Sequence, residues 1–155
     1  MKTHHLPTVL FLALIATGRL QADFSPQMKT FEISAYDTLK FSVTEIDVHP
    51  GEKVRIRFTN EGSLPKDVMG HNWVLLKAGR DPVAYATSAA TAAAKGEGYQ
   101  PRALADDVLA SIPLLGSKQT AEVTFVAPTV PGNYSFLCSY PAHCQSGMRG
   151  TLVVK

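Results

Sequence analysis

The sequence predicts an all-β domain, a two-sheet sandwich of antiparallel strands with a helical flap inserted around residues 80–112. The first observation is a series of about seven or eight short segments with strand character, most of them separated by turn-forming residues. The second is the alternation of apolar and polar side chains within these segments, which is typical of strands buried on one face. The third is a single alanine-rich stretch that interrupts this pattern after the middle of the chain. Together they favour a β-sandwich with the helical segment packed outside it.

The first half of the chain carries the most regular strand patterns. Residues 31–35 alternate apolar and polar side chains, and residues 39–43 continue this alternation. Residues 53–59 alternate most clearly, with Val54, Ile56 and Phe58 on the apolar side. Residues 71–76 are apolar after their first two positions, so we expect a strand buried on both faces.

The second half begins with the proposed flap. Asp81-Pro82 can begin a helix, and residues 85–95 are rich in alanine, the strongest helix former. Residues 103–109 are expected to add a second short helical stretch. The alanine-rich part could instead be a linker, but the tyrosines that flank it, Tyr85 and Tyr99, favour a packed helix. Strand character resumes at residues 121–125 and again before Cys138.

Residues 1–22 are predicted to be a secretory signal peptide, and residues 23–155 a single domain. Lys2 precedes an apolar run from residue 6 to residue 17, and Leu20-Gln21-Ala22 resembles a cleavage site. A membrane-spanning helix needs roughly 20 apolar residues, so this run is too short to be one. We therefore expect a periplasmic or secreted protein without a membrane span.

Charge and cysteine content exclude several classes of protein. Removal of Lys2 and Arg19 with the signal peptide would leave 13 basic and 13 acidic residues. A neutral domain lacks the basic footprint of a nucleic-acid-binding protein and has no attraction to an anionic membrane surface. Two cysteines are too few for a disulfide scaffold, so stability must come from the core.

A candidate metal site lies near the C-terminus. Cys138, His143 and Met148 fall within one segment, and strand-like residues precede and follow it. A loop anchored at both ends by strands can hold a thiolate, an imidazole and a thioether at fixed distances. This set of ligands favours copper.

A further ligand is expected from a distant segment. His71 begins the strand predicted at residues 71–76 and has the same parity as Trp73, a side chain that favours burial. One thiolate and two imidazoles with a distant methionine sulfur form the blue-copper arrangement. Each residue alone would more often have an ordinary structural role, but their joint occurrence favours a copper site.

Residues 64–75 and 136–155 resemble the corresponding segments of azurin and auracyanin, members of the cupredoxin family. The resemblance extends from about residue 31 to the C-terminus and implies a Greek-key sandwich of the plastocyanin/azurin type with one mononuclear type 1 copper ion. It implies that Asn72 ties the two ligand loops together. It also implies that His71, Cys138 and His143 are the equatorial ligands. Met148 would be a long axial sulfur ligand, and the Gly70 carbonyl would make a weak contact.

The chain departs from the azurin pattern near the site. Four residues, 144–147, separate His143 from Met148, whereas azurins have three, so the spacing is closer to that of auracyanin. Azurins also have a disulfide near the N-terminus, which this chain cannot form. Cys144 is not part of the family pattern, and we expect a thiol that does not bind the metal. As the only two cysteines, Cys138 and Cys144 could pair in metal-free oxidised protein.

The resemblance implies a soluble one-electron carrier and not an enzyme. Electrons would enter through the edge of His143, within an apolar surface that Met69, Pro141 and Ala142 help to form. The expected partners are redox proteins, for example cytochromes or copper oxidoreductases, which dock transiently on a monomer. A multicopper enzyme would need a second centre, and only His49 remains among the histidines of the mature chain. The alternative is a periplasmic copper-binding or delivery protein, although such proteins are often rich in methionine.

Overall fold

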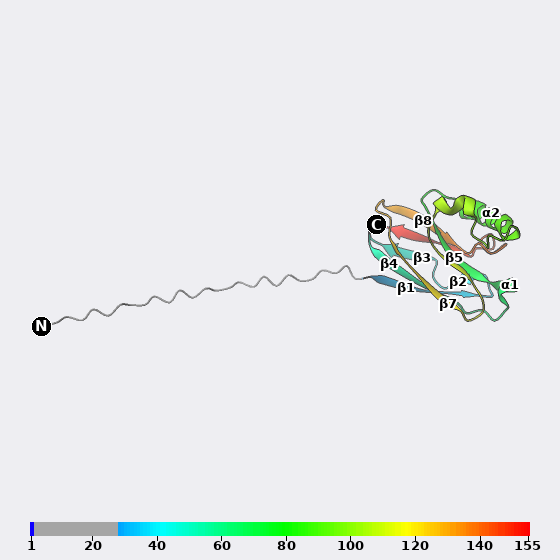
Figure 1. Cartoon of the computed structure of the whole chain (residues 1–155), viewed down its shortest axis with the longest axis horizontal. Coiled ribbons are helices and arrows are strands. Elements are labelled where there is room, and N and C mark those ends of the chain that lie inside the picture. The colour runs from blue at the N-terminus through cyan, green and yellow to red at the C-terminus, as the bar shows by residue number, and fades with distance from the viewer. Residues whose placement is uncertain (2–27) are drawn as a thin grey trace.

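The structure is a computed structural model that describes residues 28–155 and the isolated Met1, so the predicted signal peptide lies outside the described residues. Two sheets pack face to face (Figure 1). The first has the strand order β2-β1-β4-β7 and contains β1 (Lys29–Tyr36), β2 (Lys40–Phe41), β4 (Lys53–Asn60) and β7 (Thr120–Val126). The second has the order β3-β9-β8-β5-β6 and contains β3 (Glu45–Val48), β5 (His71–Leu76), β6 (Val108–Leu115), β8 (Gly132–Leu137) and β9 (Arg149–Val154).

The predicted all-β sandwich is confirmed, but the prediction that its strands are all antiparallel is wrong. β1 pairs with β4 in parallel, and β3 pairs with β9 in parallel. Between β1 and β4 the chain crosses to the second sheet to form β3, and then returns beside β1 in the same direction. The alternation of apolar and polar residues within each strand is unaffected by such crossings. The sequence pattern therefore does not distinguish parallel from antiparallel pairing.

The space between the sheets holds the main core. Apolar side chains of both sheets are fully buried there, with Ile56 and Phe58 from β4 opposite Trp73 and Phe136 from β5 and β8. The alternation predicted for residues 53–59 is confirmed, because Val54, Ile56 and Phe58 all lie inside. Every residue of β5 is buried, as expected for a strand covered on both faces.

The flap covers the outer face of the second sheet (Figure 1). Helix α2 (Pro82–Ala94) begins where the Asp81 carboxylate accepts a hydrogen bond of 2.8 Å from the Val83 N–H. Tyr85 and Ala86 pack in a second apolar cluster with Val74 and Leu137 of the sheet. The packed helix is therefore confirmed, and the linker alternative is wrong.

The flap ends earlier than residue 112. A 3₁₀ helix, η1 (Arg102–Asp107), follows α2, and residues 108–115 then form β6 at the edge of the second sheet. Pro113 interrupts this segment, and its burial pattern is irregular, as is common in edge strands. Among the described residues, no helix is both long and apolar enough to cross a membrane.

Candidate metal centre

Three side chains from two distant segments meet at one end of the core. His71 is the first residue of β5, Cys138 follows β8 directly, and His143 lies in the loop between β8 and β9. Their ligating atoms all lie within 4.8 Å of one another. The Cys138 Sγ is 4.0 Å from the His71 Nδ1 and 3.5 Å from the His143 Nδ1. Both imidazoles therefore turn the same kind of nitrogen toward the thiol.

The position of His71 follows from the packing of β5. Trp73 and Leu75 lie in the main core, whereas Val74 and Leu76 lie under the flap. His71 shares the inward parity of Trp73 and is itself fully buried. The Trp73 ring packs 5.6 Å from the Phe136 ring, between centroids, which joins β5 to β8 just below the site. The inward orientation predicted from parity is confirmed.

The loop from Cys138 to Met148 is closed by its own backbone. The Met148 N–H donates to the His143 carbonyl at 2.9 Å, and the Cys138 N–H donates to the Met148 carbonyl at 3.0 Å. Met148 is fully buried in the same core cluster as Cys138. Ala142, directly before His143, has a φ of 67°, a left-handed conformation that is uncommon for residues other than glycine. The loop therefore has little freedom to move its side chains apart.

A glycine is required at position 70 because there is no room for a side chain, and not because of the backbone conformation. It follows the short helix α1 (Lys66–Met69) and has an extended conformation, with φ of −69° and ψ of 148°. A Cβ at this position would lie 2.5 Å from the Lys66 carbonyl oxygen and 2.8 Å from the Leu114 side chain. Any larger residue would therefore shift the chain immediately before His71.

A buried pair of hydrogen bonds joins the two segments. The Asn72 side chain donates to the Ser139 Oγ at 2.8 Å and accepts from the Ser139 N–H at 2.7 Å. The Ser139 hydroxyl in turn donates to the carbonyl of Tyr99, in the flap. Because Asn72 follows His71 and Ser139 follows Cys138, these bonds fix the distance between the two side chains. The tie expected at Asn72 is confirmed.

Burial keeps the cluster uncharged in the metal-free protein. It raises the pKa of the Cys138 thiol to about 12. Burial, and secondly the nearby His71, lower the pKa of His143 to about 4, and burial also lowers the pKa of His71. Two neutral imidazoles present lone pairs, while the thiol needs a cation to lose its proton. This donor set fits a soft or borderline transition metal such as copper.

Comparison with known proteins agrees with this chemistry. The family described as copper-binding proteins of the plastocyanin/azurin family matches residues 28–155. This chain belongs to that family. Auracyanin-A of Chloroflexus aurantiacus is 38% identical over 126 residues, which cover 81% of this chain and 74% of the relative. Azurin of Pseudomonas chlororaphis is 35% identical over 127 residues, which cover 80% of this chain and 96% of the relative.

A solved structure supports the same assignment for the fold. Auracyanin A, described as a "blue" copper protein from Chloroflexus aurantiacus, matches with a TM-score of 0.71 and 35% identity. The match covers 83% of this chain and all of the other. The sandwich is therefore a cupredoxin fold, and copper is the cofactor of this family member.

Three residues of this cupredoxin's site were not predicted from the sequence. Ser139 completes the tie to Asn72, as described above. The Tyr140 ring lies 4.7 Å from the His143 ring and 4.9 Å from the Tyr99 ring, between centroids, and its hydroxyl donates to the Asp67 carbonyl. For Ser139 and Tyr140 the sequence offered one indication of a place in the site, because both directly follow Cys138. Tyr99 was noted only as a flank of the alanine-rich stretch, and nothing in the sequence pointed to its place beside the site.

Cys144 now has a structural explanation. It is fully buried in the cluster under the flap with Tyr85 and Leu137, whereas Cys138 belongs to the main core. Its neighbour His143 faces Cys138 instead. Both cysteines are free thiols in the structure, and Cys144 acts as a small apolar residue beneath α2.

Proposed function

We propose that this protein is a soluble one-electron carrier with one mononuclear type 1 copper centre. His71, Cys138 and His143 would be the equatorial ligands, Met148 the axial ligand, and the Gly70 carbonyl a weak contact. The observation that carries the proposal is the buried cluster of two Nδ1 atoms and one Sγ, all within 4.8 Å of one another. Membership of the plastocyanin/azurin family supports the same assignment.

Copper, when bound, would supply a one-electron redox couple. The chain's own contribution is to hold the ligands in one arrangement in both oxidation states. The bonds between Asn72 and Ser139 and the backbone bonds of Met148 restrict the ligand loops. Burial of all three clustered side chains excludes water, and a small rearrangement between oxidation states favours fast electron transfer.

The surface above His143 suits brief docking by redox partners. Pro141 and Ala142 are exposed in the ligand loop, and so are Leu64, just before α1, and Val68, within it. The bond from the Tyr140 hydroxyl to the Asp67 carbonyl joins these two parts of the surface. A small apolar surface around one ligand edge fits transient interfaces, which bury little area. Residues 1–22 would direct the monomeric mature domain, residues 23–155, to the periplasm or outside the cell.

Copper delivery is the less favoured alternative. A delivery protein needs a labile, open site, whereas His71 and Cys138 are fully buried and His143 is only 4% exposed. Beyond the predicted signal peptide the chain has only three methionines, Met28, Met69 and Met148. The closed geometry therefore supports retention of the metal.

The test is the absorption spectrum of the copper-loaded, oxidised protein. We expect an intense visible band from charge transfer between the Cys138 thiolate and Cu(II). Cys138→Ser should abolish the band, and Cys144→Ser, a matched change in the other buried cysteine, should retain it. A wild-type protein that binds copper without a visible band would contradict the electron-carrier proposal. Rapid loss of the bound copper to a mild chelator, with the band present, would favour delivery.

A further inference from the structure

A buried asparagine joins the two sheets at the end that carries the metal site. Asn60 is the last residue of β4, in the first sheet, and it is fully buried. Its side-chain amide donates to the Leu115 carbonyl at 3.2 Å and to the Met69 carbonyl at 3.5 Å. Leu115 ends β6 in the second sheet, and Met69 ends α1 shortly before His71. One side chain therefore contacts both the chain that leads into His71 and the strand beside it.

The contact with Leu115 lies where the pairing of β5 with β6 is irregular. His71 is opposite Leu115, but the register shifts before the next pair along β5. Pro113 lies within the shifted stretch of β6 and has no N–H to donate. Such a shift interrupts the regular ladder of hydrogen bonds between the two strands. The asparagine amide therefore adds a hydrogen bond at a point where the ladder alone holds His71 less firmly.

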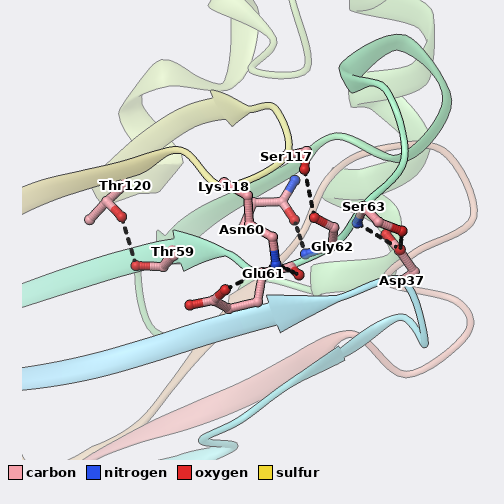
Figure 2. Close-up of polar contacts among 9 residues, drawn as sticks. All are labelled: Asp37, Thr59, Asn60, Glu61, Gly62, Ser63, Ser117, Lys118 and Thr120. Carbon is pink, nitrogen blue, oxygen red and sulfur yellow. Dashed lines mark hydrogen bonds and ion pairs between the residues drawn. The ribbon is translucent and has the colours of Figure 1, made fainter.

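The orientation of the Asn60 amide is itself fixed. Its Oδ1 accepts a hydrogen bond of 2.9 Å from the Gly62 N–H, which determines where the amide N–H groups point (Figure 2). The Asn60 carbonyl accepts from the Lys118 N–H at 2.7 Å, and its N–H donates to the Gln119 carbonyl at 3.0 Å. Backbone and side chain are thus both held, with the amide donors directed toward β6 and the end of α1.

The loop after Asn60 can approach it closely because position 62 has no side chain. A Cβ at Gly62 would lie 3.0 Å from the Asn60 Oδ1 and would collide with the Asp37 Oδ1. The Ser117 hydroxyl donates to the Gly62 carbonyl at 2.7 Å. The Asp37 Oδ2 accepts from the Ser63 N–H at 2.9 Å (Figure 2). These bonds hold the loop in the position from which it orients the asparagine.

We propose that Asn60 is a positioning residue that holds residues 69–71 in place for the metal. The inference rests on the proposed role of His71 as a copper ligand. The tie between Asn72 and Ser139 fixes this segment relative to the loop after β8, whereas Asn60 fixes it relative to β4 and β6. Without the amide, two backbone carbonyls lose their donor and the segment can shift. Hydrogen-bond partners of metal ligands typically contribute roughly 10–100-fold to affinity, and for this more distant contact we expect about tenfold.

The first measurement uses NMR relaxation of the backbone amides in the metal-free protein. Asn60→Leu replaces the amide by an apolar group of similar size that donates no hydrogen bond. It should lower the order parameters of residues 69–71 from about 0.85, the value for a rigid backbone, toward about 0.6. Order parameters report fast local motion, so a general loss of stability alone would leave them unchanged. Asn60→Ser, whose single hydroxyl proton cannot bond both carbonyls, replaces this variant if it does not fold.

The second measurement is the Cu(II) affinity of the same variants, by titration. Asn60→Leu should bind Cu(II) about tenfold more weakly than the wild type. Thr59→Val is the matched control, because it removes the bond between the Thr59 and Thr120 hydroxyls, 2.9 Å apart, one position earlier in β4 (Figure 2). Ser117→Ala removes the bond to the Gly62 carbonyl but leaves the Asn60 amide in place. Both controls should keep residues 69–71 rigid and retain the wild-type affinity.

Three results would overturn the inference. The first is a set of unchanged order parameters at residues 69–71 in Asn60→Leu. The second is lowered order parameters with unchanged Cu(II) affinity, which would show that the segment moves without consequence for the metal. The third is an equal loss of affinity in Ser117→Ala or Thr59→Val, which would assign the effect to the loop or the strand instead of the amide. The spectrum of the wild-type protein has no part in these comparisons, so a missing copper band would contradict the proposed function alone.

Discussion

At the scale of single residues, Gly70 shows how closely the site depends on packing. Gly70→Ala would place a methyl group against the Lys66 carbonyl and Leu114, at 2.5 Å and 2.8 Å. We expect a loss of about 1–3 kcal/mol in the free energy of unfolding, the usual cost of overpacking. The displaced His71 should also alter the visible band of the copper-loaded protein. Chemical denaturation and absorption spectra measure the two effects.

Gly116→Ala is the matched control for this change. Its Cβ would also approach Lys66, but at 3.3 Å from the Lys66 Cβ, a contact that a shift of a few tenths of an ångström relieves. Gly116 is buried, but its Cβ would need only a small adjustment, so we expect a smaller loss than in Gly70→Ala, about 1 kcal/mol or less, and an unchanged visible band. Equal effects of the two variants would contradict a specific role for the space at Gly70.

A substitution at His71 tests whether folding depends on the metal site. His71→Ala should leave the sandwich folded without metal at room temperature, because the apolar core between the sheets carries the fold. It should weaken copper binding and open a coordination position to water. Circular dichroism of the metal-free variant and a copper titration test this. Loss of the folded state in the metal-free variant would show that the imidazole is needed for the packing of β5.

The inward position of His71 and Cys138 could be predicted from the sequence at this scale because each stands at a strand end, whereas His143 lies in the loop between β8 and β9. His71 shares parity with Trp73, and Cys138 with Phe136, so pattern alone places them inside. The surrounding groups could not be predicted in the same way. Tyr99 reaches the site from the flap, where its carbonyl accepts from the Ser139 hydroxyl, and no local sequence pattern indicates that contact.

At the scale of elements, the helical structure of the flap could be predicted from the sequence, but the residue at which the flap ends could not. An aspartate before Pro82 and a run of alanines are local helix signals, and α2 begins and ends where they indicate. β6 has no comparable local signal, because an edge strand with Pro113 lacks clean alternation. The parallel pairing of β1 with β4 depends on where the intervening chain crosses, which no local pattern encodes.

Tyr85 tests the packing of α2 on the sheet. Its ring is buried, but its hydroxyl has no hydrogen-bond partner among residues 28–155. Tyr85→Phe removes this buried hydroxyl, so at neutral pH we expect unchanged stability or a gain of up to about 1–2 kcal/mol. Chemical denaturation measures the change. A loss above about 1 kcal/mol would show that the hydroxyl has a stabilising partner, such as a bound water.

The same variant should alter the response to alkaline pH. Burial raises the pKa of Tyr85 to about 12, from an ordinary value near 10. Between these values the unfolded chain loses the phenolic proton while the folded protein keeps it, so stability falls as the pH rises. Tyr85→Phe lacks this contribution, and its stability advantage over the wild type should grow from pH 10 toward pH 12. A constant difference across this range would contradict the raised pKa.

At the scale of the whole molecule, the metal site lies at the edge of a core that is already complete. Cys138 and Met148 belong to the same buried cluster as Ile56, Trp73 and Phe136, which come from both sheets. The sheets are joined through this cluster and not through the ligands alone. A protein of this kind differs from small zinc domains, whose folding requires the metal.

Removal of the metal should therefore leave a cooperatively folded protein. We expect the metal-free protein to unfold in one transition and copper to raise its Tm by about 10–20 °C at free metal roughly a thousand times above Kd. Binding to the folded state alone causes this increase, so it should depend on metal concentration. Differential scanning calorimetry at several copper concentrations measures it. Cys138→Ser should retain the cooperative transition and lose the copper-dependent increase, whereas Cys144→Ser should retain both. A metal-free protein without a cooperative transition would show that the core between the sheets is insufficient and that the ligands themselves hold the two sheets together.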